Sequence, residues 1–68
     1  MNKIDANKLR LLIAEKGYNI RSLARAAGVA EPTINCWLHG RSARLDVLAR
    51  VALALKMPLP DFIQAIAA

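Results

Sequence analysis

Residues 20–38 have the sequence IRSLARAAGVAEPTINCWL, and the spacing of their apolar and small residues decides the fold. Ala24 is small enough for two helices to cross closely, and Gly28 can adopt the positive φ that a sharp turn between them requires. Ile34 and Trp37 stand at i and i+3, so both lie on the packed face of the helix that follows the turn. This spacing predicts a helix-turn-helix.

The remaining apolar residues also recur at helical spacing, and no stretch has the alternation typical of a β-strand. Leu9, Leu12 and Ile13 predict a helix at about residues 5–16. Further helices are predicted at about residues 20–27, from Pro32 to about Leu38, from Leu45 to Leu55, and at about residues 60–66. The fold class is therefore all-α, with five short helices.

Local signals mark the ends of these helices. Gly17 fits the left-handed position that ends the first helix, and Asn19 can cap the second. Pro32 suits the first turn of the third helix because its missing N–H would be unpaired there, which puts Glu31 at the cap position. Met57, followed by a proline, stops the fourth helix.

The chain has 68 residues, which we interpret as one domain, residues 1–68. A domain of this size is marginally stable, and its single cysteine cannot form an intramolecular disulfide. The polar start MNKIDANK lacks the apolar core of a signal peptide, and no apolar run is long enough to span a membrane. We therefore expect a soluble cytoplasmic protein that is stabilised by helix packing and self-association.

The charges are distributed unevenly along the chain. The formal net charge is +5, and eight of the ten lysines and arginines, but only three of the five acids, precede Asp46. From Asp46 onward the chain is neutral and mostly apolar. This arrangement indicates one surface for a polyanion and another for protein, and the alternative is a basic surface that is merely solvated.

The sequence contains none of the usual constellations for catalysis. It has no paired carboxylates, no nucleophile–base couple and no glycine-rich phosphate loop, and its only histidine, His39, leaves no metal-ligand spacing. We expect no enzymatic activity, no metal, no cofactor and no small-molecule ligand.

Two segments, LARAAGVAEPTINCWLHGRS and LDVLARVALALKMPLPDFI, resemble the Cro/cI-type helix-turn-helix regulators of phages and bacteria, a lambda-repressor-like family. The resemblance extends from about Leu9 to Ile63. It implies that the third helix enters the major groove of double-stranded DNA with its N-terminal residues on base edges. It also implies that the loop from His39 to Arg44 follows the phosphate backbone, and that the protein is bacterial or phage-encoded and associated with the nucleoid.

The residues expected to read bases are Glu31, Pro32, Thr33, Asn35 and Cys36. Asn35 can pair with adenine, Thr33 can contact a base edge or a phosphate, and Cys36 can touch a thymine methyl group, with a redox role as its alternative. Glu31 either accepts a hydrogen bond from cytosine N4 or is an acid favoured by the helix dipole. Trp37 could stack on a base, but its spacing with Ile34 favours the core.

The residues expected to contact phosphate are Arg21, His39, Arg41, Ser42 and Arg44. Arg41 and Arg44 follow the third helix in a short loop, and the alternative for both is simple solvation. His39 could instead be a metal ligand, but the chain offers it no partner ligands.

Three positions depart from the family pattern. Ile20 replaces a glutamine that meets a phosphate at the start of the second helix, so Arg21 or backbone N–H groups could take that contact. Ile13 and Leu38 replace a buried Arg–Glu pair, an exchange that can be neutral or stabilising. Lys56 stands where the fourth helix usually ends in glycine, and a left-handed conformation there would cost about 1 kcal/mol.

The last two helices have more apolar residues than one core face needs. The predicted core stripe of the fourth helix is Leu45, Leu48, Ala52 and Leu55, and the fifth helix turns inward through Phe62, Ile63 and Ile66. A partner chain would cover the surplus. The predicted homodimer interface consists of Val47, Val51, Leu53, Phe62 and Ile66.

The resulting hypothesis is a dimeric transcriptional repressor that binds an inverted-repeat operator. The resemblance implies a phage or mobile-element type that can regulate its own operon, Cro-like or anti-CRISPR-associated. One alternative is an antitoxin that binds DNA and holds a partner protein with its apolar C-terminal part. Another is a structural helical adaptor, which would leave the basic surface without a purpose.

Overall fold

A computed structural model describes residues 3–68, and five helices follow one another in it. They are α1 (Ala6–Glu15), α2 (Ile20–Ala27), α3 (Glu31–Leu38), α4 (Leu45–Ala54) and α5 (Leu59–Ile66). The predicted all-α class with five helices is confirmed, and each predicted boundary lies within about one residue of the observed one. Ile4 and Ala67 form an isolated antiparallel bridge.

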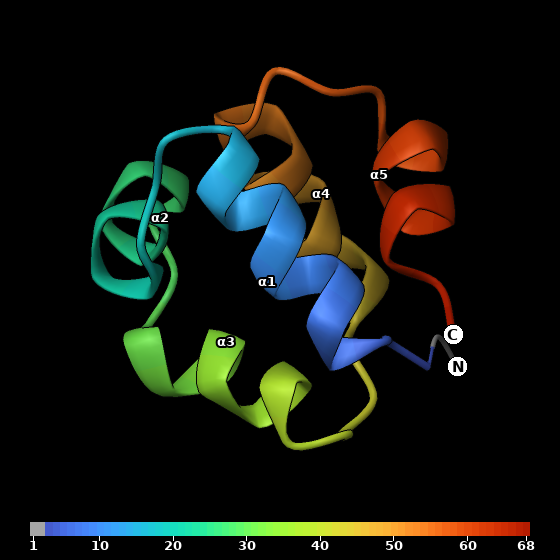
Figure 1. The fold of residues 1–68 in the computed structure, drawn as a ribbon. Coiled ribbons are helices and arrows are strands. Elements are labelled where there is room, and N and C mark those ends of the chain that lie inside the picture. The colour runs from blue at the N-terminus through green and yellow to red at the C-terminus, as the bar shows by residue number, and fades with distance from the viewer. Residues whose placement is uncertain (1–2) are drawn as a thin grey trace.

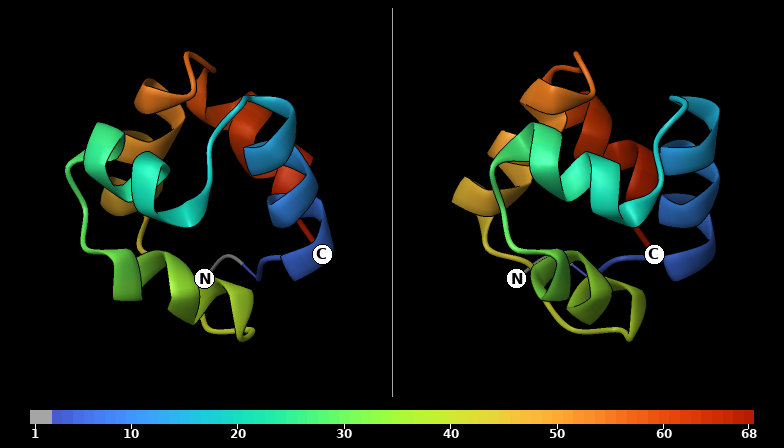
Figure 2. Two further views of the ribbon diagram at one scale, coloured as in Figure 1. Left: turned by 60° about the vertical axis from the view of Figure 1, so that its left-hand side comes forward. Right: turned by 90° about the vertical axis from the view of Figure 1, so that its left-hand side faces the viewer.

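The helices are arranged so that α3 lies across one end of the molecule (Figure 1). Helix α2 packs against both α3 and α4, and α1 packs against α3 and α5. Helices α4 and α5 also contact each other, which closes the core between α1, α2, α4 and α5. The two further views show that α3 keeps its position at this end, with one side open to solvent (Figure 2).

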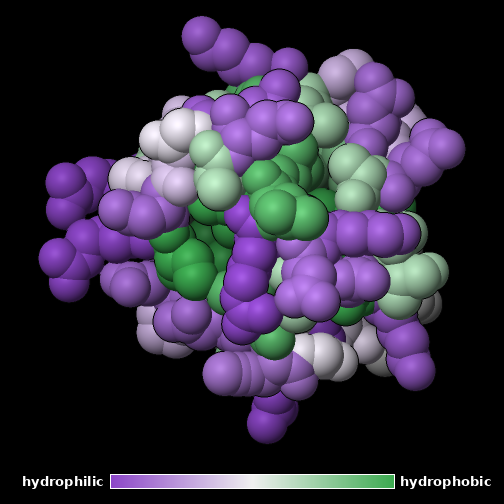
Figure 3. Space-filling model, viewed as in Figure 1, coloured by the Kyte–Doolittle hydropathy of each residue, from purple (hydrophilic) through white to green (hydrophobic). Residues whose placement is uncertain are grey.

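The core is built by apolar side chains from all five helices. Its largest fully buried members are Leu9, Leu23, Ile34, Leu48, Val51, Phe62 and Ile66. No polar or charged residue is buried within residues 3–68, so burial of apolar area is the main stabilising contribution. Charged and polar side chains cover most of the face seen in Figure 3, with apolar side chains visible between them.

The helix-turn-helix is fixed by local interactions at both ends of α2. The Asn19 side chain accepts a hydrogen bond from the Ser22 N–H at 2.8 Å, and the Asn19 N–H donates to Ser22 Oγ at 2.9 Å. This reciprocal capping box satisfies two N–H groups that the first turn would leave unpaired. At the other end, Gly28 has φ 71°, as the turn requires. The predicted cap and the predicted turn glycine are both confirmed.

The start of α3 differs by one residue from the expectation. Ala30, with φ −72° and ψ 139°, occupies the N-cap, and Glu31 is the first helical residue rather than the cap. Pro32 still lies in the first turn, where its missing N–H leaves no helical hydrogen bond unmade. Glu31 adopts the helical conformation before proline, and an acid in the first turn is favoured by the positive end of the helix dipole.

Helix α4 is rotated relative to the predicted core stripe. Leu45 is 54% exposed, whereas Val51 is completely buried beside Leu48, Ala52 and Leu55. At 100° per residue, these four buried residues share one face of the helix, and Leu45 lies at the edge of that face. The predicted stripe is therefore wrong at Leu45. Val51, which was assigned to the dimer interface, belongs to the core.

The two ends of the described chain are joined to each other. The Asp5 N–H donates to the Ile66 carbonyl at 2.8 Å, and Lys8 Nζ donates to the Ala67 carbonyl at 3.0 Å. Asp5 also caps α1, because its side chain accepts from the Asn7 and Lys8 N–H groups. These contacts hold the start of α1 next to the end of α5.

Candidate nucleic-acid interface

Helix α3 is anchored by three apolar residues that turn its other side outward. Ile34 and Trp37 are 0% and 2% exposed, and Leu38 is also buried. With these residues inward, the 100° rotation per residue places Pro32 and Cys36 at the centre of the outward side. Trp37 is thereby confirmed as a core residue. It cannot stack on a base without leaving the core.

The outward side of α3 forms a shallow surface hollow of about 400 Å³. Its lining residues are Pro32, Asn35, Cys36, His39 and Arg41. Three of these residues were predicted to read bases and two to contact phosphate, so the fold brings members of both sets together. Cys36 is an exposed free thiol.

Glu31 and Thr33 lie beside this hollow rather than in it. Both are half-buried, and the helical rotation places them on opposite flanks of α3. In contrast to both, Asn35 is exposed and lines the hollow. The geometry thus separates the five predicted base readers into three residues that line the hollow and two that flank it.

The loop after α3 folds back against the end of that helix. Gly40 has φ 82°, and the Arg41 N–H donates to the Cys36 carbonyl at 3.1 Å. Ala43 is buried and fixes the far end of the loop to the core. The exposed side chains of Arg41 and Ser42 therefore project next to the outward side of α3. This is the position that the phosphate prediction requires.

Arg44 differs from Arg41 because it already has an anionic partner. Arg44 Nη2 lies 3.1 Å from Asp46 Oδ2, in an ion pair whose two side chains are 81% and 65% exposed. Such an exposed pair contributes about 0–1 kcal/mol and can open to accept a phosphate. Arg41 has no ion pair within residues 3–68.

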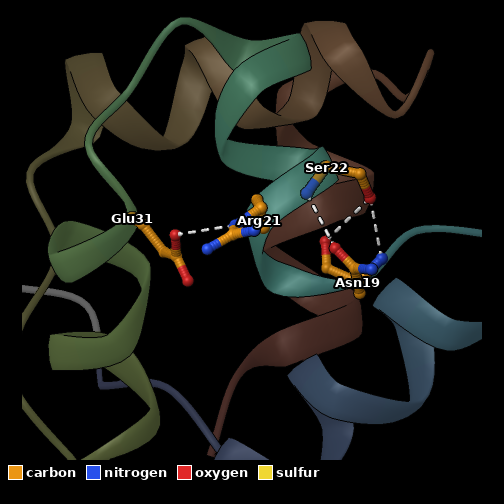
Figure 4. Close-up of polar contacts among 4 residues, drawn as sticks. All are labelled: Asn19, Arg21, Ser22 and Glu31. Atoms are coloured by element: carbon orange, nitrogen blue, oxygen red, sulfur yellow. Dashed lines mark hydrogen bonds and ion pairs between the residues drawn. The ribbon is translucent and has the colours of Figure 1, made fainter.

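A second ion pair joins α2 to α3 at their starts. Arg21 Nε lies 3.8 Å from Glu31 Oε2, and the two side chains are 77% and 44% exposed (Figure 4). From the sequence alone, Arg21 is predicted as a phosphate contact and Glu31 separately as a base reader or helix-start acid. The opposite charges at the starts of two helices joined by a tight turn were the signal that could have predicted the pair.

The predicted homodimer interface requires a correction. Val51 and Phe62 are 0% exposed and Ile66 is 1% exposed, because all three fill the core between α1, α4 and α5. Val47 is half-buried against the same core. Only Leu53, which is 80% exposed, is fully available to a partner. Leu45 was not assigned to the interface, yet its 54% exposure makes it available as well.

Two further observations concern the part of the chain that the structure describes. No helix in the described part of the chain is long and apolar enough to cross a membrane. Within residues 3–68, no three histidine, cysteine, aspartate or glutamate side chains come together in a way that could hold a metal ion.

A short helix anchored by its inner side, a tight glycine turn before it and a basic loop after it define a helix-turn-helix DNA-binding domain. The family model of the Cro/C1-type HTH DNA-binding domain matches residues 8–68, and the chain belongs to this family. No curated protein and no solved structure matches the chain.

Proposed function

We propose that the protein is a sequence-specific transcriptional repressor that binds an inverted-repeat operator as a homodimer. The observation that carries this proposal is the outward side of α3, where Asn35 and Cys36 stand next to Arg41. Asparagine and a small apolar contact can read bases, while arginine binds phosphate without reading sequence. A surface that combines them suits specific recognition rather than general DNA coating.

Base readout is assigned to Asn35 and Cys36, with Pro32 and Thr33 as van der Waals or hydrogen-bonding neighbours. Phosphate contact is assigned to Arg41, Ser42, His39 and Arg44, and to Arg21 at the start of α2. No catalytic activity is part of the proposal. The cytoplasm of a bacterium, close to the nucleoid, is the compartment where such a regulator would act, and a phage or mobile element is its proposed source.

The dimer is proposed to form through the outer side of α4. Leu45, Ala49 and Leu53 stand at i, i+4 and i+8, so they form one stripe along that helix. Leu45 and Leu53 are two of the three large hydrophobic residues exposed in the described chain. Pairing through this stripe would double the number of bases read and bury apolar surface that a small domain otherwise leaves in water.

Binding-site selection from a random duplex pool tests the proposal, together with footprinting on DNA that flanks the protein's own gene. The expected result is one preferred inverted repeat with half-site centres about 10–10.5 bp apart, and protection of a promoter. Occlusion of that promoter would lower its transcription. A pool that shows no enrichment after repeated selection would overturn the proposal.

The antitoxin alternative has one observation in its favour. Leu11, which is 71% exposed, lines a shallow surface hollow between α1 and α5 together with Lys8, Leu12, Glu15 and Ala65. A partner protein could cover this second apolar area while α3 binds DNA. Copurification of the untagged protein distinguishes the two functions, since a different protein bound in fixed ratio supports the antitoxin and a clean homodimer supports the repressor.

A further inference from the structure

We propose that Glu31 does not read a base but positions Arg21 as a phosphate clamp at the start of α2. This inference rests on the proposed function, because it assigns roles within the same DNA-binding surface. It concerns two residues that come from different helices and meet across the helix-turn-helix (Figure 4).

The geometry of the pair leaves the phosphate-binding end of the arginine free. Glu31 Oε2 lies 3.8 Å from Nε of Arg21, which is the nitrogen closest to the side-chain stem. The two terminal nitrogens of the guanidinium have no partner within residues 3–68. Because a guanidinium presents its donors in a planar fork, an arginine whose Nε is paired with a carboxylate can still offer donors from both terminal nitrogens to a phosphate.

The position of Glu31 argues against base readout. It lies on a flank of α3, is half-buried, and does not line the hollow that contains Asn35 and Cys36. Its carboxylate is oriented toward α2, where it meets Arg21, rather than along the outward side of α3 (Figure 4). A carboxylate that reads cytosine N4 has to reach the floor of the major groove instead.

The position of Arg21 suits a phosphate. In this motif the first helix crosses the DNA backbone while the second lies in the groove. Arg21 is the second residue of α2, and its side chain is 77% exposed, so its charged end is accessible there. Ile20, beside it, has no polar group with which to make the contact. The nearby Glu31 carboxylate attracts the guanidinium and favours this orientation of Arg21 before binding, which lowers the entropy that the contact would otherwise cost.

The pair also explains why an acid is tolerated at the DNA surface. An unpaired carboxylate near phosphates is repelled, whereas a carboxylate next to a guanidinium adds no net charge to the surface. Removal of the Glu31 charge should therefore change DNA affinity in opposite directions, depending on whether Arg21 is present. With Arg21 present, removal of the Glu31 charge costs orientation. Without Arg21, the same removal only relieves repulsion.

A double-mutant cycle on DNA affinity tests this inference. The duplex selected by the wild-type protein is titrated, at several salt concentrations, with the wild type, Glu31→Gln, Arg21→Gln and the double variant. We expect Arg21→Gln to weaken binding and to lower the salt slope by about 1. Glu31→Gln should weaken binding by about two- to fivefold when Arg21 is present, and should not weaken it in the Arg21→Gln background.

Three controls make the result specific. Glu15→Gln removes an exposed carboxylate at the last residue of α1, at the other end of the molecule from α3, and should show no coupling to Arg21→Gln. Arg21→Lys keeps the charge but lacks the Nε grip, so it should retain the salt slope and lose the dependence on Glu31. Thermal unfolding of each variant checks that the fold is intact.

Equal effects of Glu31→Gln in both backgrounds, of either sign or none, would overturn the positioning role. A changed base preference at one operator position would return Glu31 to base readout. Arg41→Ala, measured together with the cycle, distinguishes a failure of the Arg21–Glu31 role from a failure of the proposed DNA-binding function. If the wild type prefers its duplex and Arg41→Ala weakens binding while the cycle shows no coupling, the regulator stands and the Arg21–Glu31 role fails. If the wild type prefers no duplex, the regulator proposal itself fails.

Discussion

Arg41 and Arg44 follow the same helix by only a few residues, yet they differ in what they must give up to bind a phosphate. Arg44 has to leave Asp46, whose carboxylate lies 3.1 Å away, whereas Arg41 has no ion pair within residues 3–68. The free energy that Arg44 contributes to DNA binding is only the difference between its interaction with a phosphate and its interaction with Asp46. The contribution of each arginine to DNA affinity should therefore differ although both side chains are exposed.

Replacement of either arginine by alanine should weaken DNA binding to a similar extent on all sequences, because phosphate contacts position the protein without specifying bases. We expect each variant to lower the slope of log K against log salt by about 1, with the larger loss of affinity for Arg41→Ala. Fluorescence anisotropy at several salt concentrations measures both quantities. Lys16→Ala, at the opposite end of the molecule from α3, is the matched control. Unchanged slopes for both arginine variants would make them solvated surface charges.

Asn35→Ala should alter which base pair is preferred, because Asn35 is exposed on the outward side of α3. The loss at the affected position should be about 1–3 kcal/mol, and Thr33→Ala, on the flank, should cost less. Binding-site selection with each variant gives the preferred sequence. If all three proteins selected the same sequence with the same stringency, neither residue would read a base.

At the scale of one element, α4 ends in an unfavourable backbone conformation. Lys56 has φ 58°, and it is the only residue other than glycine with a positive φ in the described chain. The helix reverses there so that the Met57 N–H can donate to the Ala52 carbonyl at 3.0 Å. A β-carbon in this region is crowded by the backbone, and glycine avoids the clash.

Lys56→Gly should therefore stabilise the protein by up to about 1 kcal/mol, less the extra entropy that glycine gains in the unfolded chain. Lys16→Gly is the matched control, because Lys16 occupies the C-cap of α1 with φ −82° and should lose stability when replaced. Chemical denaturation of the three proteins compares their free energies of unfolding. A Lys56→Gly variant no more stable than Lys16→Gly would show that the left-handed conformation carries no strain.

The elements were predicted well because their signals are local. The Asn19 cap, the Gly28 turn and the spacing of Ile34 and Trp37 all act within a few residues, and each was found as expected. The family pattern marked Lys56 as a position where a left-handed conformation would be strained, and Lys56 adopts that conformation, with φ 58°. The rotation of α4 was not predicted, because Leu45 and Val51 are equally apolar and only the packing against α2 and α5 decides which is covered.

In the candidate site, too, some features were predicted from the sequence and others were not. The sequence predicted that Asn35 and Cys36 face outward, since burial of one side of α3 determines what the other side presents, and both line the surface hollow together with Arg41. It did not identify the Arg21–Glu31 pair, although the opposite charges at the two helix starts were a signal for it, or the Arg44–Asp46 pair, whose formation depends on side-chain conformations. The contacts between the ends of the chain were missed as well. They join residues far apart in the sequence.

At the scale of the whole molecule, the question is how two copies would meet. Val51→Lys, which the sequence alone suggests as a test of dimerisation, would instead place a charge in the core, where Val51 is 0% exposed. This variant would unfold the domain and would therefore not test dimerisation. Leu53, at 80% exposure, is the position where a charge tests association without disturbing the core.

Leu53→Lys should convert a dimer to a monomer and strongly weaken binding to an inverted repeat, while the affinity for a single half-site stays nearly unchanged. Sedimentation at micromolar concentration gives the oligomeric state. Leu11→Lys changes an equally apolar, 71% exposed side chain on α1 and should leave the dimer intact. If Leu11→Lys dissociated the protein and Leu53→Lys did not, the interface would lie on α1. A monomeric wild type would remove the dimer altogether.

Trp37 lies on the same helix as the proposed base readers but on its buried side, and it is the only tryptophan in the chain. Its indole is consequently a single built-in fluorophore that reports on the state of the core. Unfolding should shift its emission to longer wavelengths as the ring enters water. DNA should leave the emission maximum in place, since bases cannot reach the ring. For a variant that has lost DNA binding, this optical signal can therefore show whether the protein is misfolded or still folded.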